Sequence, residues 1–473
     1  MKRNPNRKKK WIACAAALAL LLSLTVCLPG ASASAEGGPG GQPPEMPGAM
    51  GNPPSGGPGG PGGHGGPGSS SADISYTAAV DIDAADSQDG QTYASSSADE
   101  NALLISTDAE VSITNPTVTK SGDSDGGDNC NFYGLNAAVL VKDGATATIT
   151  GGTITSNASG ANGVFCYGGN GGQNGAGGDG TTLIIRDTVI TTTGSGSGGI
   201  MTTGGGTTYA YDLTVETSGQ SSAPIRTDRG GGTVVVDGGS YTSNGLGSPA
   251  IYSTADISVS NATLVSNLSE GVCIEGKNSI TLTDCDLTAN NTKCNGNATF
   301  LDSIMIYQSM SGDADSGTSS FTMSGGSLTS KSGHVFHVTN TSAVITLSGV
   351  NIVNEDAGNV LLSVCDDGWS GAGNTAVLKA VGQELSGAVL VGSDSSLSLE
   401  LSEGSTFEGC IDGSIVNAKG ETVSTEVGTV SVTLDASSTW TLTGDSYISS
   451  FSGDLANVNT NGYTLYVDGE AIS

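Results

Sequence analysis

Charged side chains that could act on a substrate are scarce in this chain of 473 residues. Only 16 residues are lysine or arginine, and six of these lie within the first ten positions. The segments APIRTDRGGG and EGVCIEGK carry the acids Asp228 and Glu275 and the bases Arg226, Arg229 and Lys277. Two carboxyl groups can cleave a glycosidic bond as acid and base. The candidates for catalysis are therefore Asp228, Arg229, Glu275 and Lys277.

Aromatic and polar residues that suit sugar binding follow the same repeated motif. Aromatic residues make up only 5% of the sequence, yet several fall close to these charges in successive copies. Rings can stack on pyranose faces, while charges orient hydroxyl or carboxylate groups. The candidate substrate-binding residues are Phe165, Tyr167, Arg226, Tyr252, Tyr307, Gln308 and Phe336. The plain alternative is that the charges form surface ion pairs and that loops cover the rings.

One further segment, DSDGGDNCN, is rich in oxygen ligands. Its aspartates Asp123, Asp125 and Asp128 are weak candidates for a calcium site, because carboxylates are the ligands that calcium prefers. The spacing does not match an EF-hand loop, so a simple polar turn is the alternative.

A repeated strand pattern must position these residues. Short alternating runs such as TATITGGTITSN, GTVVVDGGSYTS and AVITLSGVNIVN recur, each followed by a motif with a central apolar residue. One copy alone would expose its apolar face, so only stacking on its neighbours buries a core. The sequence therefore predicts an all-β fold: a single-stranded right-handed parallel β-helix, preceded by a disordered Gly/Pro-rich linker.

The two-residue period of a strand assigns side chains to faces. If Ile225 points into the core, Arg226 and Asp228 point outward. The same phase in each copy predicts outward ladders that include Tyr252, Glu275 and the other candidates. Asp228 and Glu275 would lie two coils apart, with backbones about 9 to 10 Å from each other, which suits an inverting glycosidase.

The ends of the chain differ from the repeats. A basic start, an apolar run and small residues predict a signal peptide over residues 1–35, so we expect a secreted, cell-surface-associated protein without a membrane span in the mature chain. A lipoprotein anchor on Cys27 or an uncleaved membrane anchor are the alternatives. The Gly/Pro-rich linker covers 36–72 and a transition and cap 73–100. The β-helix covers 101–414, and a terminal β coil and cap covers 415–473.

The net charge argues against nucleic-acid binding, and the cysteine spacing argues against a zinc site. The formal charge of −30 becomes −36 without the signal peptide, and such a chain repels nucleic acid. Its natural counter-ions are cations, and calcium is a plausible one outside the cell. Seven cysteines remain after the signal, without CxxC spacing, so they predict small buried residues rather than a zinc site. Cys285 and Cys294 are the one pair near enough in sequence to suggest a bridge.

The repeated units resemble right-handed β-helix proteins of the pectate-lyase-like superfamily, and the Gly/Pro-spaced secreted form resembles adhesin-like surface proteins of Gram-positive bacteria. The resemblance covers roughly residues 100–473. It implies a second chemistry, in which Arg229 or Lys277 abstracts a proton beside a uronate carboxylate while Asp228 or Glu275 holds calcium. The sequence lacks the paired-aspartate, GHG and RIK motifs of the enzymes with this fold, which disfavours catalysis.

Three functions remain open at the level of sequence. The leading hypothesis is a surface β-helix that binds a polysaccharide or another cell-envelope glycan through the face around Arg226, Tyr252 and Glu275. The alternatives are a polysaccharide lyase or inverting glycoside hydrolase acting on acidic polysaccharide, and a passive or self-associating structural protein.

Overall fold

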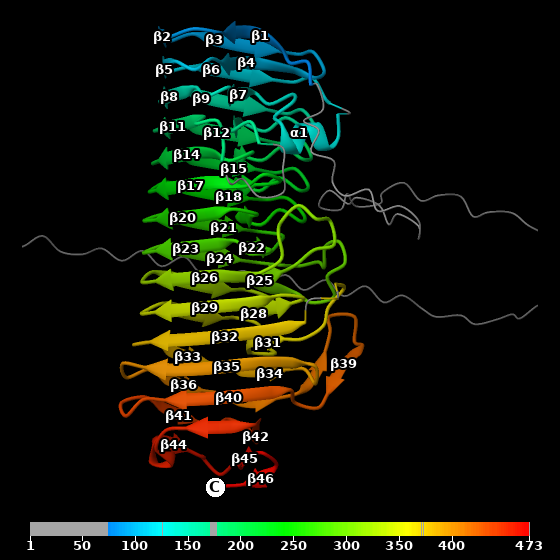
Figure 1. The fold of residues 1–473 in the computed structure, drawn as a ribbon, viewed down its shortest axis with the longest axis vertical. Coiled ribbons are helices and arrows are strands. Elements are labelled where there is room, and N and C mark those ends of the chain that lie inside the picture. The colour runs from blue at the N-terminus through cyan, green and yellow to red at the C-terminus, as the bar shows by residue number, and fades with distance from the viewer. Residues whose placement is uncertain (1–73, 125, 171–176, 370, 372, 473) are drawn as a thin grey trace, which may run out of the picture. The chain divides into compact units, whose positions relative to one another are not determined.

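The computed structural model describes residues 74–124, 126–170, 177–369, 371 and 373–472. Over these residues the chain winds into stacked coils, and most coils contribute one strand to each of three long parallel sheets, named here sheets A, B and C (Figure 1). The predicted all-β parallel β-helix is thereby confirmed. The predicted signal peptide (1–35) and linker (36–72) lie outside the described residues.

Sheet A matters most for function, because the motifs with central apolar residues form its strands. In order they are β1 (Thr77–Ile82), β4 (Glu100–Ser106), β7 (Val139–Lys142), β10 (Val164–Tyr167), β13 (Ile200–Thr203), β16 (Ile225–Thr227), β19 (Ile251–Ser253), β22 (Val272–Glu275), β25 (Asp302–Tyr307), β28 (His334–Thr339), β31 (Val360–Val364), β34 (Ala388–Val391) and β37 (Ile411–Asp412).

The alternating runs of the repeats form sheets B and C. Sheet B contains β2 (Asp86–Asp89), β5 (Glu110–Thr114), β8 (Thr146–Thr150), β11 (Thr182–Arg186), β14 (Gly206–Tyr211), β17 (Gly232–Asp237), β20 (Asp256–Ser260), β23 (Ser279–Thr283), β26 (Thr318–Ser324), β29 (Ser342–Ser348), β32 (Asn374–Val381), β35 (Ser395–Ser402), β40 (Thr429–Leu434) and β43 (Ser450–Ser452). Sheet C contains β3 (Thr92–Ser95), β6 (Thr117–Lys120), β9 (Thr153–Ser156), β12 (Val189–Thr192), β15 (Thr214–Thr217), β18 (Ser240–Ser243), β21 (Thr263–Ser266), β24 (Asp286–Ala289), β27 (Ser327–Ser330) and β30 (Asn351–Asn354).

Both ends of the stack extend the coil pattern. Strands β1, β2 and β3, in the segment that we expected to be a transition and cap, pair in register with β4, β5 and β6 and so form a first coil. After β30 the third face continues separately. Its strands are β33 (Glu384–Ser386), β36 (Thr406–Glu408), β41 (Thr439–Thr441) and β44 (Val458–Asn459), and the last coils add β42 (Ser446–Ile448), the 3₁₀ turn Leu455–Asn457, β45 (Leu465–Val467) and β46 (Glu470–Ala471).

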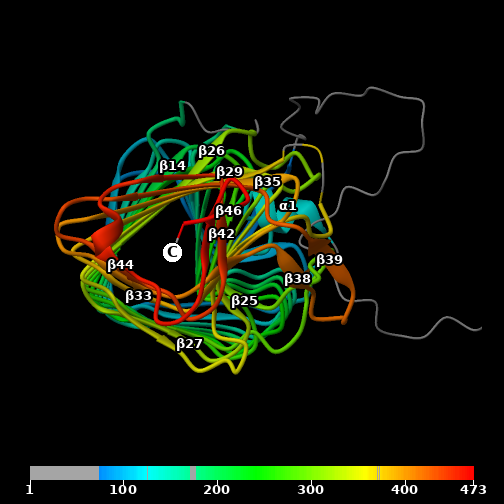
Figure 2. The same cartoon turned by 90° about the horizontal axis from the view of Figure 1, so that it is seen from below.

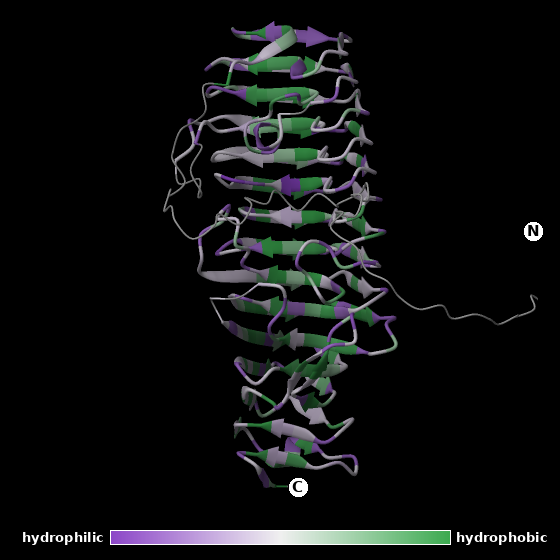
Figure 3. Ribbon diagram, turned by 90° about the vertical axis from the view of Figure 1, so that its right-hand side faces the viewer, coloured by the Kyte–Doolittle hydropathy of each residue, from purple (hydrophilic) through white to green (hydrophobic). Residues whose placement is uncertain are grey.

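The core consists of ladders of apolar side chains that point into the coil. On sheet A the equivalent residues pair from strand to strand and are fully buried: Val164, Ile200, Ile225, Ile251, Val272, Ile304 and Phe336. Stacked coils lie about 4.8 Å apart, so each side chain packs on its equivalents above and below. Figure 3 shows hydrophobic residues recurring along the strands of the coils.

Phe336 corrects one sequence-based prediction. We expected it to point outward as a sugar-binding ring, but it pairs with Ile304 in the inward ladder and packs edge-on against Phe321, with ring centroids 5.8 Å apart. The segment HVFHVT offers two neighbouring apolar residues, so its own pattern does not fix the phase. The stacking register does, and it places His337 rather than Phe336 on the outer face beside Met305.

The corner between sheets B and C is made by residues with positive φ. Gly238 and Gly325 occupy it in two coils, and Asp187, Asp212 and Asn261 occupy it in others, with φ between 50° and 75°. Glycine, asparagine and aspartate tolerate this left-handed conformation best, so small polar residues at this position turn the chain at every coil.

Loops cover part of the outer face of sheet A. They carry the short helix α1 (Asp128–Phe132) and, further along, the antiparallel hairpin of β38 (Ser414–Val416) and β39 (Thr422–Thr425). In the view down the long axis of the stack, α1 and the β38–β39 hairpin lie on the same side, outside the strands (Figure 2). No helix in the described part of the chain is long and apolar enough to cross a membrane.

Candidate functional site

The candidate site lies on the outer face of sheet A, where the stacking register brings distant residues side by side. The outward ladder runs through Phe165, Met201, Arg226, Tyr252, Cys273, Met305 and His337. Beside it, Glu275 on β22 pairs in register with Tyr307 on β25. The structure therefore gathers most of the predicted residues on one face, but it buries nearly all of them.

Phe165 and Tyr167 lie beneath the α1 segment. Phe165 is fully buried, and Tyr167 packs edge-on against Tyr133, with ring centroids 5.6 Å apart. Together with Phe132 and Leu140 they form a small second hydrophobic core between α1 and sheet A. These two rings attach α1 to the sheet and leave no face on which a sugar could stack.

The basic residues of this face are each neutralised by an acid. Arg226 forms an ion pair with Asp228 at 2.8 Å, and both side chains are buried. Arg229 pairs with Asp313 at 2.7 Å, and its guanidinium lies 4.2 Å from the Phe132 ring centroid.

Lys277 completes this set of neutralised bases, pairing with Asp315 at 2.9 Å in a more exposed position. None of the three predicted bases is therefore available, unpaired, to hold an anionic ligand.

Burial also decides how these groups titrate. Burial raises the pKa of Asp228, in spite of the Arg226 guanidinium beside it. Burial alone would lower the pKa of Arg229, but the Asp313 carboxylate outweighs it and raises that pKa above its usual value. Arg229 therefore stays protonated and cannot serve as the general base of a lyase.

Glu275 is the centre of a buried hydroxyl network. Its Oε2 accepts hydrogen bonds from the phenols of Tyr252 at 2.6 Å and Tyr307 at 3.2 Å. Its Oε1 accepts from the Ser309 and Ser311 hydroxyls. Burial, and then the Glu275 charge, raise the pKa of both tyrosines, so both remain donors. A carboxylate with four such donors holds neighbouring side chains in place and is not exposed to a substrate.

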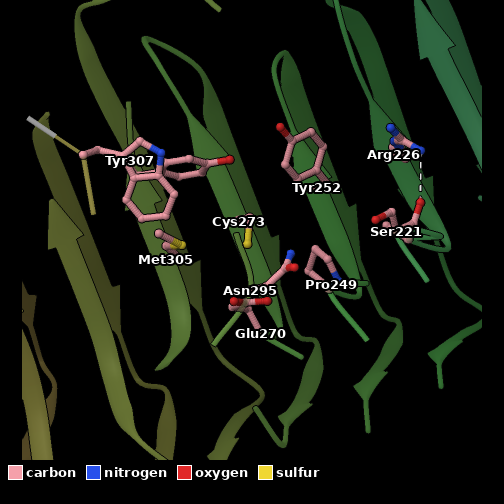
Figure 4. Close-up of a pocket in the computed structure, with 12 residues that line it drawn as sticks. Ser221, Arg226, Pro249, Tyr252, Glu270, Cys273, Asn295, Met305 and Tyr307 are labelled. Atoms are coloured by element: carbon pink, nitrogen blue, oxygen red, sulfur yellow. Dashed lines mark hydrogen bonds between the residues drawn. The ribbon is translucent and has the colours of Figure 1, made fainter. Parts of the chain in front are cut away.

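A pocket opens beside this network, and its walls are aromatic (Figure 4). The rings of Tyr252, Tyr307 and Trp369 line it, and Tyr307 and Trp369 contact each other with centroids 5.0 Å apart. Its volume is about 50 Å³, which gives room for about three or four water-sized groups but not for a sugar ring. The pocket is lined in full by Ser221, Ala223, Arg226, Gly247, Pro249, Tyr252, Glu270, Cys273, Asn295, Met305, Tyr307 and Trp369.

A second hollow adjoins the pocket at Ser221 and Arg226. Its volume is about 460 Å³, and it extends past the serine and glycine turns before sheet A to Asp128 at the start of α1. The two hollows run along the stack from the coil of β10 to that of β25. Those six strands are five steps of about 4.8 Å apart, so the hollows follow the face for about 24 Å.

Glu270 and Asp302 form a buried acidic pair next to the aromatic pocket. The register of β22 and β25 places them on adjacent coils, and both are almost fully buried. Glu270 lines the pocket and accepts a hydrogen bond from Ser269, whereas both carboxyl oxygens of Asp302 lack any hydrogen-bond partner among the described residues. Burial, and then the Glu270 charge, raise the pKa of Asp302 well above its usual value.

Asp367 fastens two loops of the pocket to sheet A. Its Oδ1 accepts hydrogen bonds from the backbone and the hydroxyl of Thr299, each at 2.6 Å, and its Oδ2 lies 3.4 Å from Nε2 of His337. The Thr299 loop also carries Asn295, and Trp369 follows Asp367 by two residues. Asp367 therefore sets the position of two walls of the pocket.

The remaining predicted residues have structural roles. Gln308 donates to the backbone carbonyls of Ser309 and Ala314 and so holds the loop after β25. Asp123 accepts from the backbone of Ser159, and Asp125 lies outside the described residues.

Asp128 begins α1 and lines the second hollow, apart from the aromatic pocket. No group of three histidine, cysteine, aspartate or glutamate residues in the described ranges could hold a metal ion.

Cys285 and Cys294 are both free thiols. Cys285 bonds to a carbonyl in the interior of the coil, whereas Cys294 belongs to the loop over sheet A, so a Cys285–Cys294 bridge is not formed.

Sequence reasoning missed the residues that wall the pocket from loops. Trp369 and Asn295 lie outside the repeated motifs, so no periodicity assigned them to a face, and Glu270 begins the motif EGVCIEGK, in which only later residues were candidates. The sequence feature that could have pointed to Trp369 is the double aspartate in SVCDDGWSG, which it follows closely.

Comparisons of the chain with models of protein families, with curated proteins and with solved structures found no match.

Proposed function

We propose that this protein is a secreted, cell-surface β-helix that binds a polysaccharide or another cell-envelope glycan along the outer face of sheet A. The observation that carries the proposal is the pocket walled by Tyr252, Tyr307 and Trp369, with Arg226, Glu270 and Asn295 at its polar edges. Aromatic walls with a few fixed polar groups suit carbohydrate, because rings cover the apolar sugar faces and polar groups orient the hydroxyls.

The dimensions of the face support a linear ligand. The aromatic pocket is too small for a whole ring and is suited to one substituent, while the adjoining hollow continues along the stack. Several sugars in a row would contact successive coils and place one substituent in the pocket. This geometry favours a polymer over a free monosaccharide.

Binding is better supported than catalysis. Asp228 and Glu275, the expected acid and base, are both buried, one beside Arg226 and the other among four hydroxyl donors. An inverting glycosidase needs room for a water between its two carboxyl groups, and neither carboxyl lines the pocket. A lyase base among Arg229 and Lys277 is disfavoured by their ion pairs.

Secretion and family membership are parts of the same proposal. The basic, apolar and small-residue order of residues 1–35 supports export, and the Gly/Pro-rich segment that follows suits a spacer between a surface and the β-helix. The repeats suggest a relation to the pectate-lyase-like superfamily, and the fold alone carries no activity with it.

A glycan array probed with the full-length chain tests the proposal. We expect binding to a polymeric glycan, and a loss of about 10- to 100-fold in affinity in Trp369→Ala, because the loss of one wall of the pocket should cost about 1.4 to 2.8 kcal/mol. The matched control is Tyr447→Ala, which removes an exposed ring that stacks on Tyr466 at the far end of the chain. Equal binding by wild type and Trp369→Ala would contradict the proposal.

A further inference from the structure

The charges around the aromatic pocket do not balance. Arg226, Arg229 and Lys277 are each paired with an aspartate, so the bases of this face are already neutralised. Glu270 and Asp302, in contrast, form no ion pair within the part of the chain that the structure describes. Within the described residues, the pocket therefore has two acidic groups without a cationic partner next to its aromatic residues.

Asp302 is the more deeply buried of these two acids. It is 1% exposed, and neither carboxyl oxygen has a hydrogen-bond partner among the described residues. It lies one coil from Glu270, which itself lines the pocket. A buried, unpartnered carboxyl group destabilises a fold unless it is protonated or a cation approaches it. The arrangement favours a positively charged ligand group at Glu270.

The walls of the pocket suit the same kind of group. Three aromatic residues, Tyr252, Tyr307 and Trp369, line part of the space, and a cation is attracted to the faces of such rings. The volume of about 50 Å³ admits an ammonium group and the carbon that bears it. The Glu270 carboxylate can accept charge-assisted hydrogen bonds from N–H donors, which a primary amine has and a quaternary amine lacks.

We propose that the pocket binds a primary amine on the glycan, so that the ligand is a polymer of amino sugars with free amino groups rather than an acidic polysaccharide. This inference rests on the proposed function and specifies its ligand class. The strong negative charge of the whole chain, −30 by composition, would attract such a cationic polymer and repel a polyuronate.

Titration calorimetry with the full-length chain tests the inference with four probes: a glucosamine oligosaccharide, its N-acetylated form, an oligogalacturonate and free choline. We expect the glucosamine oligosaccharide to bind at least about 10-fold more tightly than each of the others, because only its ammonium groups can donate charge-assisted hydrogen bonds to the Glu270 carboxylate. Glu270→Gln should remove this preference. Glu110→Gln, an exposed acid on β5 of sheet B outside the pocket, is the matched control and should retain it.

The outcomes separate the two proposals. Tighter binding of the N-acetylated form or of the oligogalacturonate overturns the amine assignment and leaves glycan binding intact. Tighter binding of choline overturns the primary amine in favour of a quaternary one. No binding of any oligosaccharide overturns the proposed function and the inference together. If Glu270→Gln does not fold, the ranking of the probes by the wild-type chain still decides the matter.

Discussion

At the scale of single residues, burial determines what each charged group can do. Glu275 was a candidate catalyst because its residue type and strand phase are right, but its four hydroxyl partners make it a support for Tyr252 and Tyr307. Glu270 begins the motif EGVCIEGK and was not a candidate, yet it lines the pocket without a cationic partner among the described residues. The chemistry of the site follows from these surroundings rather than from residue type.

The role of Tyr252 can be separated into ring and hydroxyl. Tyr252→Phe keeps the wall of the pocket and removes one donor to Glu275, so we expect a loss of affinity of no more than about 3-fold and a loss of stability of about 1 kcal/mol. Tyr252→Ala removes the wall, and its affinity should fall by about 10-fold or more. Calorimetry and thermal unfolding measure both, and equal losses of affinity in the two variants would contradict a role for the ring.

Asp302 gives a prediction for pH. Its pKa in the folded state is raised by burial, and it faces Glu270, Asp367, Cys273 and Cys294. Its contribution to stability is therefore full below the unfolded pKa of about 3.9 and is lost as the pH rises toward the folded pKa.

Asp302→Asn mimics the protonated acid. Its melting temperature should match that of the wild type near pH 4 and exceed it by about 2 °C or more at pH 7. Thermal scans at pH 4 and pH 7 measure the difference in melting temperature between Asp302→Asn and the wild type. If that difference does not increase from pH 4 to pH 7, Asp302 is not a buried acid with a raised pKa.

At the scale of elements, the strands were predictable and the loops were not. Period-two alternation identified the strands, and the spacing of Ile225, Ile251 and Val272 indicated one coil per repeat. The phase failed at Phe336, where neighbouring apolar residues left two choices and packing against Ile304 decided between them. Trp369 and Asn295 were missed because a loop has no period that assigns its side chains to a face.

The inward position of Phe336 can be tested by stability. Phe336→Ala should lower the free energy of unfolding by about 3 to 5 kcal/mol, because it leaves a cavity in the core beside Phe321. Val353→Ala, on the exposed side of β30, is the control and should change it by less than about 0.5 kcal/mol. Guanidinium unfolding measures both, and a surface-like effect at Phe336 would restore the outward assignment.

Asp367 joins its own loop, which carries Trp369, to the loop around Thr299, so replacing it should loosen the walls of the pocket. In Asp367→Asn we expect faster amide hydrogen exchange over 294–301, because the contact with His337 and the acceptor strength toward Thr299 are weakened. Glycan affinity should fall by about 3- to 10-fold, corresponding to about 0.7 to 1.4 kcal/mol. Exchange over 240–243 in β18 serves as the internal control, and unchanged exchange over 294–301 would show that Asp367 does not hold this loop.

At the scale of the whole molecule, the regular spacing of the coils places residues from several repeats on one face. The fold could be predicted from repetition, because each repeat buries its apolar face only by stacking. The gathering of Arg226, Tyr252 and Glu275 on one face could also be predicted from strand phase. The pocket itself could not be predicted. Its shape depends on the loops that cover the outer face of sheet A and on ion pairs such as Arg229–Asp313, which join segments that are distant in sequence.

A crystal structure of the protein with a bound oligosaccharide would show whether glycan binds at the aromatic pocket. We predict a sugar chain along the outer face of sheet A, with one substituent in the pocket between Tyr252, Trp369 and Glu270. A sugar bound only elsewhere would contradict the account. The groove of about 680 Å³ where sheet C ends, between Gly349–Asn354 and Gly382–Ser386, is the alternative place to look.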